Sequence, residues 1–365
     1  MFARAPGDPD RVRRLPPLAA HLLLAFSSCA LLSLVIVSME WLARWLEPDY
    51  LVRTRGIHVS STSYGWIGRP LAVAEMGGGR VSLNRLGFRG WELVAPKPGD
   101  RTRVVVLGDS IAFGFGVSDE QVFPEILDAR DNGIEAGNFA VQGYGPGQEL
   151  LVLQRDGLRV DPDVVILAVC LRNDFADAVL PVALYNGITP RPYFRLVGKH
   201  LRLENPVPRS AAARVVGGLS DYSQLYNRAS ALLTAPPKPA AASWRQRKQE
   251  ALRDEDYVLR LSVALLMEMD SVCRERGITF LVATFPNGVD FAVEPPLHGR
   301  FYEQLSRAGI RVVAFRARFN ALGLKPADVT LDDTGHLNPR GHALVAEVLE
   351  REIATEYGRR ADPGR

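Results

Sequence analysis

The sequence predicts an α/β fold in which a parallel sheet is covered by helices on both faces. From residue 103 onward, short apolar segments alternate with helical patterns, as in parallel strands joined by crossover helices. The chain has 365 residues, 47% hydrophobic and 23% charged, a composition that can bury a large core. Each expected strand is short, apolar and followed by turn residues: 104–107, 137–141, 164–169, 279–285 and 312–315.

Two long helical patterns lie in the second half of the chain. A helix over about 244–276 is expected before the fourth strand, with Gly277 as its C-terminal cap. Asn338 and Pro339 suit the N-cap and the first turn of the last helix. Apolar residues at helical spacing are expected to face the core: Val258, Leu261, Leu265, Met269 and Val272 in the first helix, and Leu344, Val345, Val348 and Leu349 in the second.

Near its N-terminus the chain carries an almost continuous apolar run over residues 18–39. As a helix this run would measure roughly 33 Å, enough to cross a bilayer core of about 30 Å. Trp41 and Trp45 follow, where interfacial aromatic rings are favoured. A cleaved signal peptide would be shorter and end in small residues, and a lipoprotein would not stay apolar beyond Cys29. We therefore expect a cytoplasmic tail (1–17) and an uncleaved transmembrane anchor (18–40).

The distribution of charge gives this anchor a mild orientation. More arginines precede the span than follow it closely, which favours a cytoplasmic N-terminus and an exported body. The net charge is only +3, so nothing indicates a nucleic-acid-binding surface. The three cysteines do not form the pattern of a disulfide framework. The arginines before the span are Arg4, Arg11, Arg13 and Arg14, and those close after it are Arg44, Arg53 and Arg55. The three cysteines are Cys29, Cys170 and Cys273.

Two regions depart from the strand–helix alternation. Residues 41–102, rich in Gly, Pro and Arg, are expected to form an approach segment that packs as a linker on the outside of the main domain. Residues 175–244 form an insertion, in which 193–197 and 200–203 are typical of a hairpin. A Pro/Ala-rich stretch, 235–242, follows. The insertion is either a lid that selects the substrate or a packing element against the approach segment.

The first candidate catalytic residue is Ser110, which follows the first apolar strand in Gly108-Asp109-Ser110. The carboxyl edge of a parallel sheet is where ligand crevices form. A serine hydroxyl is a weak nucleophile and needs a histidine base steadied by a carboxylate. His336 lies in a loop just before the last helix, with Asp333 three residues upstream, so one tight turn can join them.

The other five histidines are less suited to this role. His342 falls inside the last helix, where a half-exposed surface position is expected rather than catalysis. The remaining four lie in the span, the approach segment, the hairpin and a loop: His21, His58, His200 and His298.

Hydrolysis of an ester also needs donors for the tetrahedral oxyanion. Gly143 follows the second strand and can expose its backbone N–H, while Asn173 follows the third strand and can offer its side-chain amide. The backbone N–H of Ser110 is the third candidate. Each residue alone is also typical of an ordinary turn, and only their order after successive strands favours an oxyanion hole. Asp109 is expected to bond nearby backbone rather than to perform chemistry.

Taken together, these blocks resemble the SGNH hydrolase superfamily, also called GDSL-type esterases. Ser110, Gly143, Asn173 and His336 stand where the four residues that name the superfamily would stand. The first block reads Gly-Asp-Ser-Ile, with isoleucine in place of leucine. The third reads Leu171-Arg172-Asn173-Asp174, with the leading glycine replaced, and the fifth, Asp-x-x-His, is complete in residues 333–336. The resemblance covers a domain of residues 103–355, which leaves 356–365 as a C-terminal tail.

The resemblance implies a flavodoxin-like three-layer α/β/α sandwich and a covalent acyl-enzyme mechanism. Ser110 would attack the ester, His336 would take the proton, and Asp333 would hold the imidazole; Ser110, Gly143 and Asn173 would form the oxyanion hole. Neither a metal nor another cofactor is required.

An exported, anchored hydrolase looks like the bacterial proteins that edit cell-surface glycans at the inner (cytoplasmic) membrane. We expect an esterase that removes small acyl groups, acetyl above all, from a polysaccharide or glycoconjugate. A lipid esterase, an O-acyltransferase with the same triad and an idle glycan-binding domain remain alternatives. No feature of the sequence indicates an oligomeric state.

Overall fold

A five-stranded parallel sheet lies at the centre of the computed structural model, which describes residues 17–97, 99–130, 132–184, 188–208, 210–233, 241–287, 291 and 293–361. All neighbouring strands of this sheet pair in parallel. In spatial order its strands are β13 (Arg311–Ala314), β12 (Thr279–Phe285), β7 (Val164–Cys170), β5 (Thr102–Gly108) and β6 (Ile134–Asn138). Counted along the chain this is the order 2-1-3-4-5, the doubly wound flavodoxin-like arrangement. The predicted fold class is confirmed.

Two strand boundaries differ from the prediction. Strand β6 ends at Asn138, so the apolar residues 139–141 belong to the loop after it. This loop continues along the end of β5, because the N–H groups of Phe139 and Val141 donate to the carbonyls of Val106 and Gly108. These residues are apolar because the loop is buried, and not because they belong to the strand. Strand β13 also ends early, and Phe315 begins a helix.

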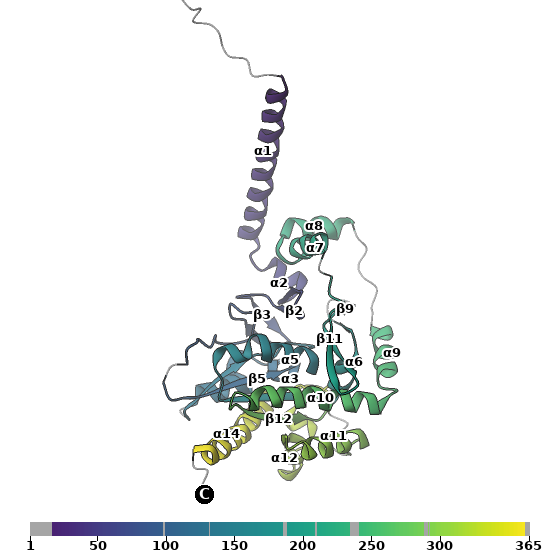
Figure 1. Ribbon diagram of the computed structural model, residues 1–365. Coiled ribbons are helices and arrows are strands. Elements are labelled where there is room, and N and C mark those ends of the chain that lie inside the picture. The colour runs from purple at the N-terminus through teal and green to yellow at the C-terminus, as the bar shows by residue number, and fades with distance from the viewer. Residues whose placement is uncertain are drawn as a thin grey trace, which may run out of the picture.

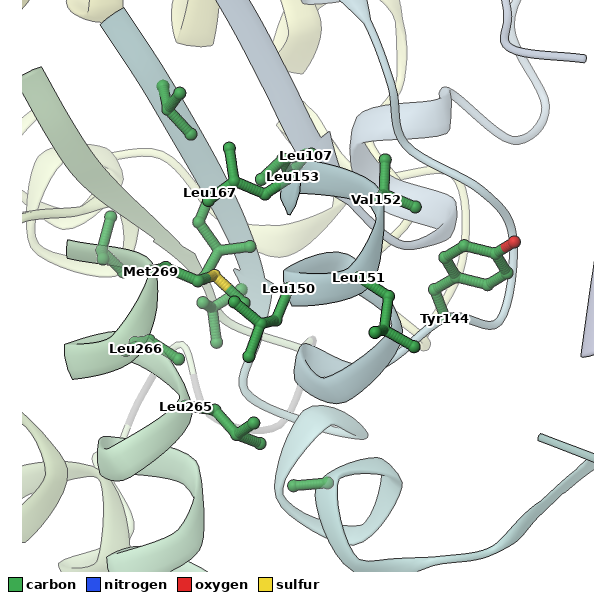
Figure 2. Close-up of a cluster of buried hydrophobic side chains, with 14 of the residues drawn as sticks. Leu107, Tyr144, Leu150, Leu151, Val152, Leu153, Leu167, Leu265, Leu266 and Met269 are labelled. Atoms are coloured by element: carbon green, nitrogen blue, oxygen red, sulfur yellow. The ribbon is translucent and has the colours of Figure 1, made fainter. Parts of the chain in front are cut away.

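Helices cover both faces of the sheet and make the three layers. On one face lie α5 (Pro146–Arg155), α10 (Glu255–Arg274) and α11 (Pro296–Arg307). Figure 2 shows how Leu150 of α5 and Met269 of α10 lie against Leu167 of the sheet. The other face is covered by α3 (Ser110–Phe113), α4 (Phe123–Ala129), α12 (Phe315–Ala321) and α14 (Pro339–Ala361). Burying one such leucine side chain contributes about 1.5–3 kcal/mol, so these layers supply much of the stability.

The long helix predicted over 244–276 is two helices. The first, α9 (Ala241–Ala251), ends before α10, which begins at Glu255. Asp254 causes the break, since its carboxylate accepts a hydrogen bond from the N–H of Tyr257 at 2.9 Å and caps α10. The predicted start of the last helix is confirmed at Pro339. That helix continues to Ala361, so most of the expected tail (356–365) is helical.

The approach segment is more than a linker on the outside of the domain. It contains α2 (Tyr50–Arg55) and two hairpins, β1 (His58–Ser61) with β2 (Gly65–Gly68) and β3 (Val73–Met76) with β4 (Gly79–Ser82). Trp66 and Phe88 are each 1% exposed and belong to the core cluster of the main domain. The guanidinium of Arg89, fully buried, donates to the carbonyls of Phe113 and Gly114 just after the first turn at Ser110. The segment therefore supports the loop that carries the serine.

The insertion consists of hairpins and helices that reach two different places. The predicted hairpin is confirmed as β10 (Tyr193–Val197) and β11 (His200–Glu204). Before it come α6 (Asp174–Val179), β8 (Val182–Leu184) and β9 (Ile188–Pro190), and after it α7 (Ala211–Tyr222) and α8 (Gln224–Leu233). Figure 1 shows α7 and α8 beside the lower end of α1 (Pro17–Leu46), far from α9. Of the predicted Pro/Ala-rich stretch, 235–240 lie outside the described residues.

Helix α1 projects away from the sheet domain in Figure 1. In the part of the chain that the structure describes, it is the one helix long and apolar enough to cross a membrane, over Leu18–Leu46, and its apolar window is entirely exposed. A membrane anchor and a signal sequence both have this character. The predicted cytoplasmic tail and its four arginines fall outside the described residues, apart from Pro17.

Candidate active site

Ser110 stands at the carboxyl edge of the sheet, where the loops after three adjacent strands meet. Strand β5 lies between β6 and β7, so the residues that follow each strand emerge side by side. Gly108 makes the close approach possible: its φ is 151°, and a Cβ there would lie 3.0 Å from the Cβ and the carbonyl oxygen of Ala168. A side chain at position 108 would therefore push β5 and β7 apart just below the serine.

The hydroxyl of Ser110 is paired with a histidine that is itself paired with a carboxylate. His336 Nε2 lies 2.9 Å from Ser110 Oγ, and His336 Nδ1 lies 2.7 Å from Asp332 Oδ2. Because Asp332 accepts at Nδ1, the neutral ring carries its proton there and turns the lone pair of Nε2 toward Ser110. The ring of Phe115 packs against the imidazole with centroids 4.8 Å apart. The three residues have the geometry of a nucleophile, a base and an orienting acid.

The acid in contact with the histidine is Asp332, whereas the sequence predicted Asp333. Asp332 forms a turn around its own Oδ1, which accepts hydrogen bonds from the N–H of Thr334 at 2.9 Å and from its hydroxyl at 2.6 Å. This turn brings the other oxygen, Oδ2, to the imidazole, while Asp333 is exposed. Two adjacent aspartates both satisfy a loose spacing rule. The signal that separates them is the threonine two residues after Asp332, which is typical of an Asx turn.

The same contacts keep Asp332 ionised. Partial desolvation raises the pKa of the carboxyl, but the hydrogen bonds from His336 and Thr334 outweigh it and lower the pKa to about 2. The carboxylate is thus negative at any pH at which an imidazole can act as a base.

Asn173 follows β7 and lies on the other side of the serine. Its Nδ2 donates to Asp109 Oδ2 at 2.7 Å, and Asp109 Oδ1 accepts from the N–H of Ile111 at 2.9 Å. The expectation that Asp109 bonds nearby backbone is confirmed, and the contact with Asn173 is one that the sequence did not indicate. Burial raises the pKa of Asp109. With one amide hydrogen held by Asp109, the second N–H of Asn173 has a fixed direction.

Gly143 stands at the margin of this site. It lies exposed in the loop after β6 with a φ of 75°, and its carbonyl accepts a hydrogen bond from Arg191 Nη1 at 3.3 Å. The structure thus places Gly143 in the loop after β6, the strand next to β5, as predicted, but not among the described residues that line the cavity at the serine.

That cavity has a volume of about 340 Å³, near the lower end of the range for small-molecule sites. Two of its lining side chains are cations, Arg172 and Lys248, from the loop after β7 and from α9. Lys248 Nζ lies 3.7 Å from Asp177 Oδ2. The full lining is Ser110, Ile111, Cys170, Arg172, Asn173, Lys248, Thr334 and His336. Two further hollows border α7 and contain none of the predicted site residues.

Sequence reasoning missed the buried charges behind the site. Arg191, 1% exposed, donates to Asp177 Oδ1 at 3.1 Å and to the carbonyls of Leu180 and Gly143. It therefore joins two parts of the insertion, β9 and α6, to the loop after β6. Glu149 and Asp174 are also buried, and desolvation raises the pKa of each well above its ordinary value. No local pattern distinguishes these residues from surface charges.

His342 corrects a further expectation. It is fully buried, not half-exposed, and its Nδ1 accepts a hydrogen bond from the N–H of Phe123 at 3.3 Å. Burial lowers the pKa of His342 to about 3, so it is neutral and acts in packing. Across the described residues, no group of three or more His, Cys, Asp and Glu side chains is arranged to hold a metal ion.

Comparison with known proteins finds similar solved structures. No family model and no curated protein matches the chain. It is similar to an acetylxylan esterase from Geobacillus stearothermophilus, with 14% identity, a TM-score of 0.40, and coverage of 70% of this chain and 95% of that one. A GDSL-like lipase from Bacteroides thetaiotaomicron has 12% identity and a TM-score of 0.37, with coverage of 70% of this chain and 89% of that one. A member of the lipolytic G-D-S-L family from Veillonella parvula has 14% identity and a TM-score of 0.37, with coverage of 67% of this chain and 94% of that one.

Proposed function

We propose that this chain is a serine esterase of the SGNH hydrolase type, anchored in a membrane by α1. The observation that carries the proposal is the relay Ser110–His336–Asp332, with 2.9 Å between Oγ and Nε2 and 2.7 Å between Nδ1 and Oδ2. A serine within hydrogen-bond reach of a base that is oriented by a carboxylate is the arrangement that activates a hydroxyl for acyl transfer.

The reaction follows from these contacts. Ser110 Oγ attacks the ester carbonyl while His336 Nε2 takes the hydroxyl proton, and Asp332 stabilises the imidazolium that forms. The bond from the acyl carbon to the alcohol oxygen then breaks, and His336 returns the proton to the leaving alcohol. A water molecule, activated by the same histidine, hydrolyses the acyl-enzyme and regenerates the serine.

The oxyanion of each tetrahedral intermediate needs fixed donors. Asn173 is the side-chain donor, since Asp109 holds its amide at 2.7 Å beside the serine. The backbone N–H groups of Ser110 and Gly143 are the other two candidates. The loss of one such donor raises the barrier by roughly 3–4 kcal/mol.

The cavity favours a small acyl group on a larger carrier. A volume of about 340 Å³ accommodates an acetyl or similar group together with part of its alcohol, but few apolar side chains line it. Arg172 and Lys248 add positive charge to the wall of the cavity. We therefore propose acyl esters of a cell-surface glycan as the substrate, and acidic sugars with a carboxylate near the ester as the preferred class.

Anchoring and orientation complete the proposal. An apolar helix followed by Trp41 and Trp45 suits a single span, and the arginine bias favours a body on the outer side of a bacterial inner membrane. Such a protein would meet glycans in the periplasm or at the cell surface.

The test uses the full chain in detergent or lipid nanodiscs and compares nitrophenol release from acetyl, butyryl and longer esters, with Ser110→Ala as the control. Serine-dependent turnover that falls steeply with chain length supports the proposal. A preference for long chains favours a lipid esterase instead. Nitrophenol release that depends on an added glycan, with the acyl group recovered on that glycan, favours an O-acyltransferase. Absence of nitrophenol release with and without glycan favours the binding domain.

A further inference from the structure

Helix α7 of the insertion turns its apolar side outward. Apolar residues recur along it at the spacing of one helical face, yet this face is exposed in the structure. In a surface helix of a soluble domain the apolar face is the one that packs inward. The exposed residues of the stripe are Val215 (61%), Val216 (52%), Leu219 (43%) and Tyr222 (48%).

Polar contacts fix this orientation. Asp221, 8% exposed, lies on the opposite side of α7, and its Oδ2 accepts a hydrogen bond from the N–H of Ser60 at 2.9 Å. Its carbonyl accepts from Arg69 Nη1 at 2.6 Å. Because the inward face of α7 is tied to the hairpin β1–β2 by buried polar groups, the helix cannot roll to bury its apolar stripe without breaking them.

The helices α7 and α8 are also held at one position along α1, near its C-terminal end. The carboxylate of Glu40 accepts hydrogen bonds from Ser223 Oγ and from the N–H groups of Gln224 and Leu225 at 2.9–3.1 Å, and so caps α8. Directly after the end of α1, Glu47 pairs with Arg228 of α8 at 2.9 Å. Figure 1 shows α8 lying across the direction of α1 at this level.

Level with this junction, α1 carries its own aromatic residues. Trp41 and Trp45 are 69% and 68% exposed and follow directly on the predicted span 18–40. Amphipathic helices with such stripes bind at the boundary between headgroups and acyl chains, where tryptophan side chains are also favoured.

We propose that α7 and α8 lie flat in the headgroup layer of the bilayer that α1 crosses, with Val215, Val216 and Leu219 of the stripe inserted among the acyl chains, while the ring of Tyr222 stays against Arg69, 5.6 Å from its guanidinium. This inference rests on the proposed anchoring by α1. Two attachments, one spanning and one interfacial, prevent rotation of the catalytic body about α1 and give its cavity one direction relative to the membrane.

The experiment measures the depth of a fluorophore on the full chain. An environment-sensitive nitrobenzoxadiazole label is placed at Val216→Cys in a Cys29→Ser background, since Cys170 and Cys273 are buried. The protein is reconstituted in nanodiscs of phosphatidylethanolamine and phosphatidylglycerol. The matched control carries the label at Ala354→Cys, exposed near the far end of α14 (Figure 1). We expect blue-shifted emission and quenching by doxyl-labelled lipids about threefold stronger at 216 than at 354.

Three outcomes would overturn the inference. Equal accessibility of both labels to aqueous iodide, in protein that resists carbonate extraction, leaves the anchor in place but removes the interfacial helices. Shielding from iodide without quenching by doxyl lipids means that a second copy of the chain covers the stripe. Release by carbonate removes the anchor and the inference together. Turnover of nitrophenyl acetate, measured on the same samples, reports the proposed esterase separately.

A second variant tests the stripe itself. Val215→Asp with Leu219→Asp changes two side chains that are exposed on α7, so the fold is retained. With the label at 216, this variant is expected to lose the lipid quenching. Quenching that persists unchanged in the variant contradicts insertion of the stripe.

Discussion

The carboxyl edge of the sheet and the insertion are held in place by different kinds of contact. At the edge, Ser110, Gly143 and Asn173 follow three hydrogen-bonded parallel strands, so the backbone ladder positions them. In the insertion, α7 and α8 are positioned by polar side chains that reach Ser60, Arg69 and Glu40, more than 150 residues away in the chain. The edge therefore has one geometry dictated by the fold, while the insertion can move if a few polar contacts are lost.

The largest effect separates the two candidate acids at the edge. Asp332→Asn is expected to lower kcat by about 10⁴-fold, because the amide no longer fixes the tautomer of His336 or stabilises its charged form. Asp333→Asn, the matched control, is expected to retain nearly full activity, since Asp333 is exposed beside the turn. Steady-state kinetics on nitrophenyl acetate make the comparison. The reverse order of effects would restore the acid predicted from the sequence.

The same pair has a defined dependence on pH. The hydrogen bonds to Asp332 lower its pKa to about 2. Its carboxylate therefore stays ionised throughout the pH range in which an ordinary aspartate is protonated, and it is protonated only as the pH falls toward 2. Protonation of Asp332 should therefore contribute nothing to the acid limb of kcat/KM in the ordinary range of aspartate. An additional protonation of the carboxylate between pH 4 and 5 would contradict the contact at 2.7 Å.

The next effect concerns the oxyanion. Asn173→Ala is expected to lower kcat by about 10²–10³-fold with little change in KM, because the amide acts on charge that develops in the transition state. Asp109→Asn tests whether the contact at 2.7 Å positions that amide, and it should lower kcat without abolishing the reaction. An unchanged kcat for Asn173→Ala would leave Asn173 as a turn residue only.

A smaller effect concerns two cations that line the same cavity, Arg172 of the edge and Lys248 of α9, just after the insertion. Arg172→Gln and Lys248→Gln are each expected to reduce the preference for an anionic ester by about tenfold in kcat/KM, or 1.4 kcal/mol. The substrates are 4-acetoxy-3-nitrobenzoate and neutral nitrophenyl acetate, which share the acetyl group. Arg247→Gln, an exposed charge on the same helix, serves as the control. If the ratio of kcat/KM for the anionic ester to kcat/KM for the neutral ester is the same in the wild type and in all variants, an acidic carrier is excluded.

The comparison also explains which features could be predicted from the sequence. Apolar strands and their following turns are local patterns, so the sheet, the serine, the asparagine and the histidine were all predictable. Asp332 was not, because its side chain is placed by a turn that depends on Thr334 and not on spacing alone. The exposed stripe of α7 was not predictable either, since a helical pattern does not say which face distant partners such as Ser60 and Arg69 will hold inward. Similarly, the burial of Arg191 depends on contacts with α6 and with the loop after β6, which are far apart in the chain.

The smallest effect tests the independence of the two regions. Glu40→Ala removes the carboxylate that accepts hydrogen bonds at the start of α8, and losing such a cap costs about 1 kcal/mol. Amide hydrogen exchange in α8 should become roughly fivefold faster, while exchange in β5 and β7 and turnover of nitrophenyl acetate stay unchanged. Glu303→Ala, which removes an exposed carboxylate paired with Arg307 on α11, is the control and should leave α8 unaffected. Faster exchange in both α8 and β5 would mean that the junction with α1 also stabilises the sheet edge, and the two regions would then respond as one unit.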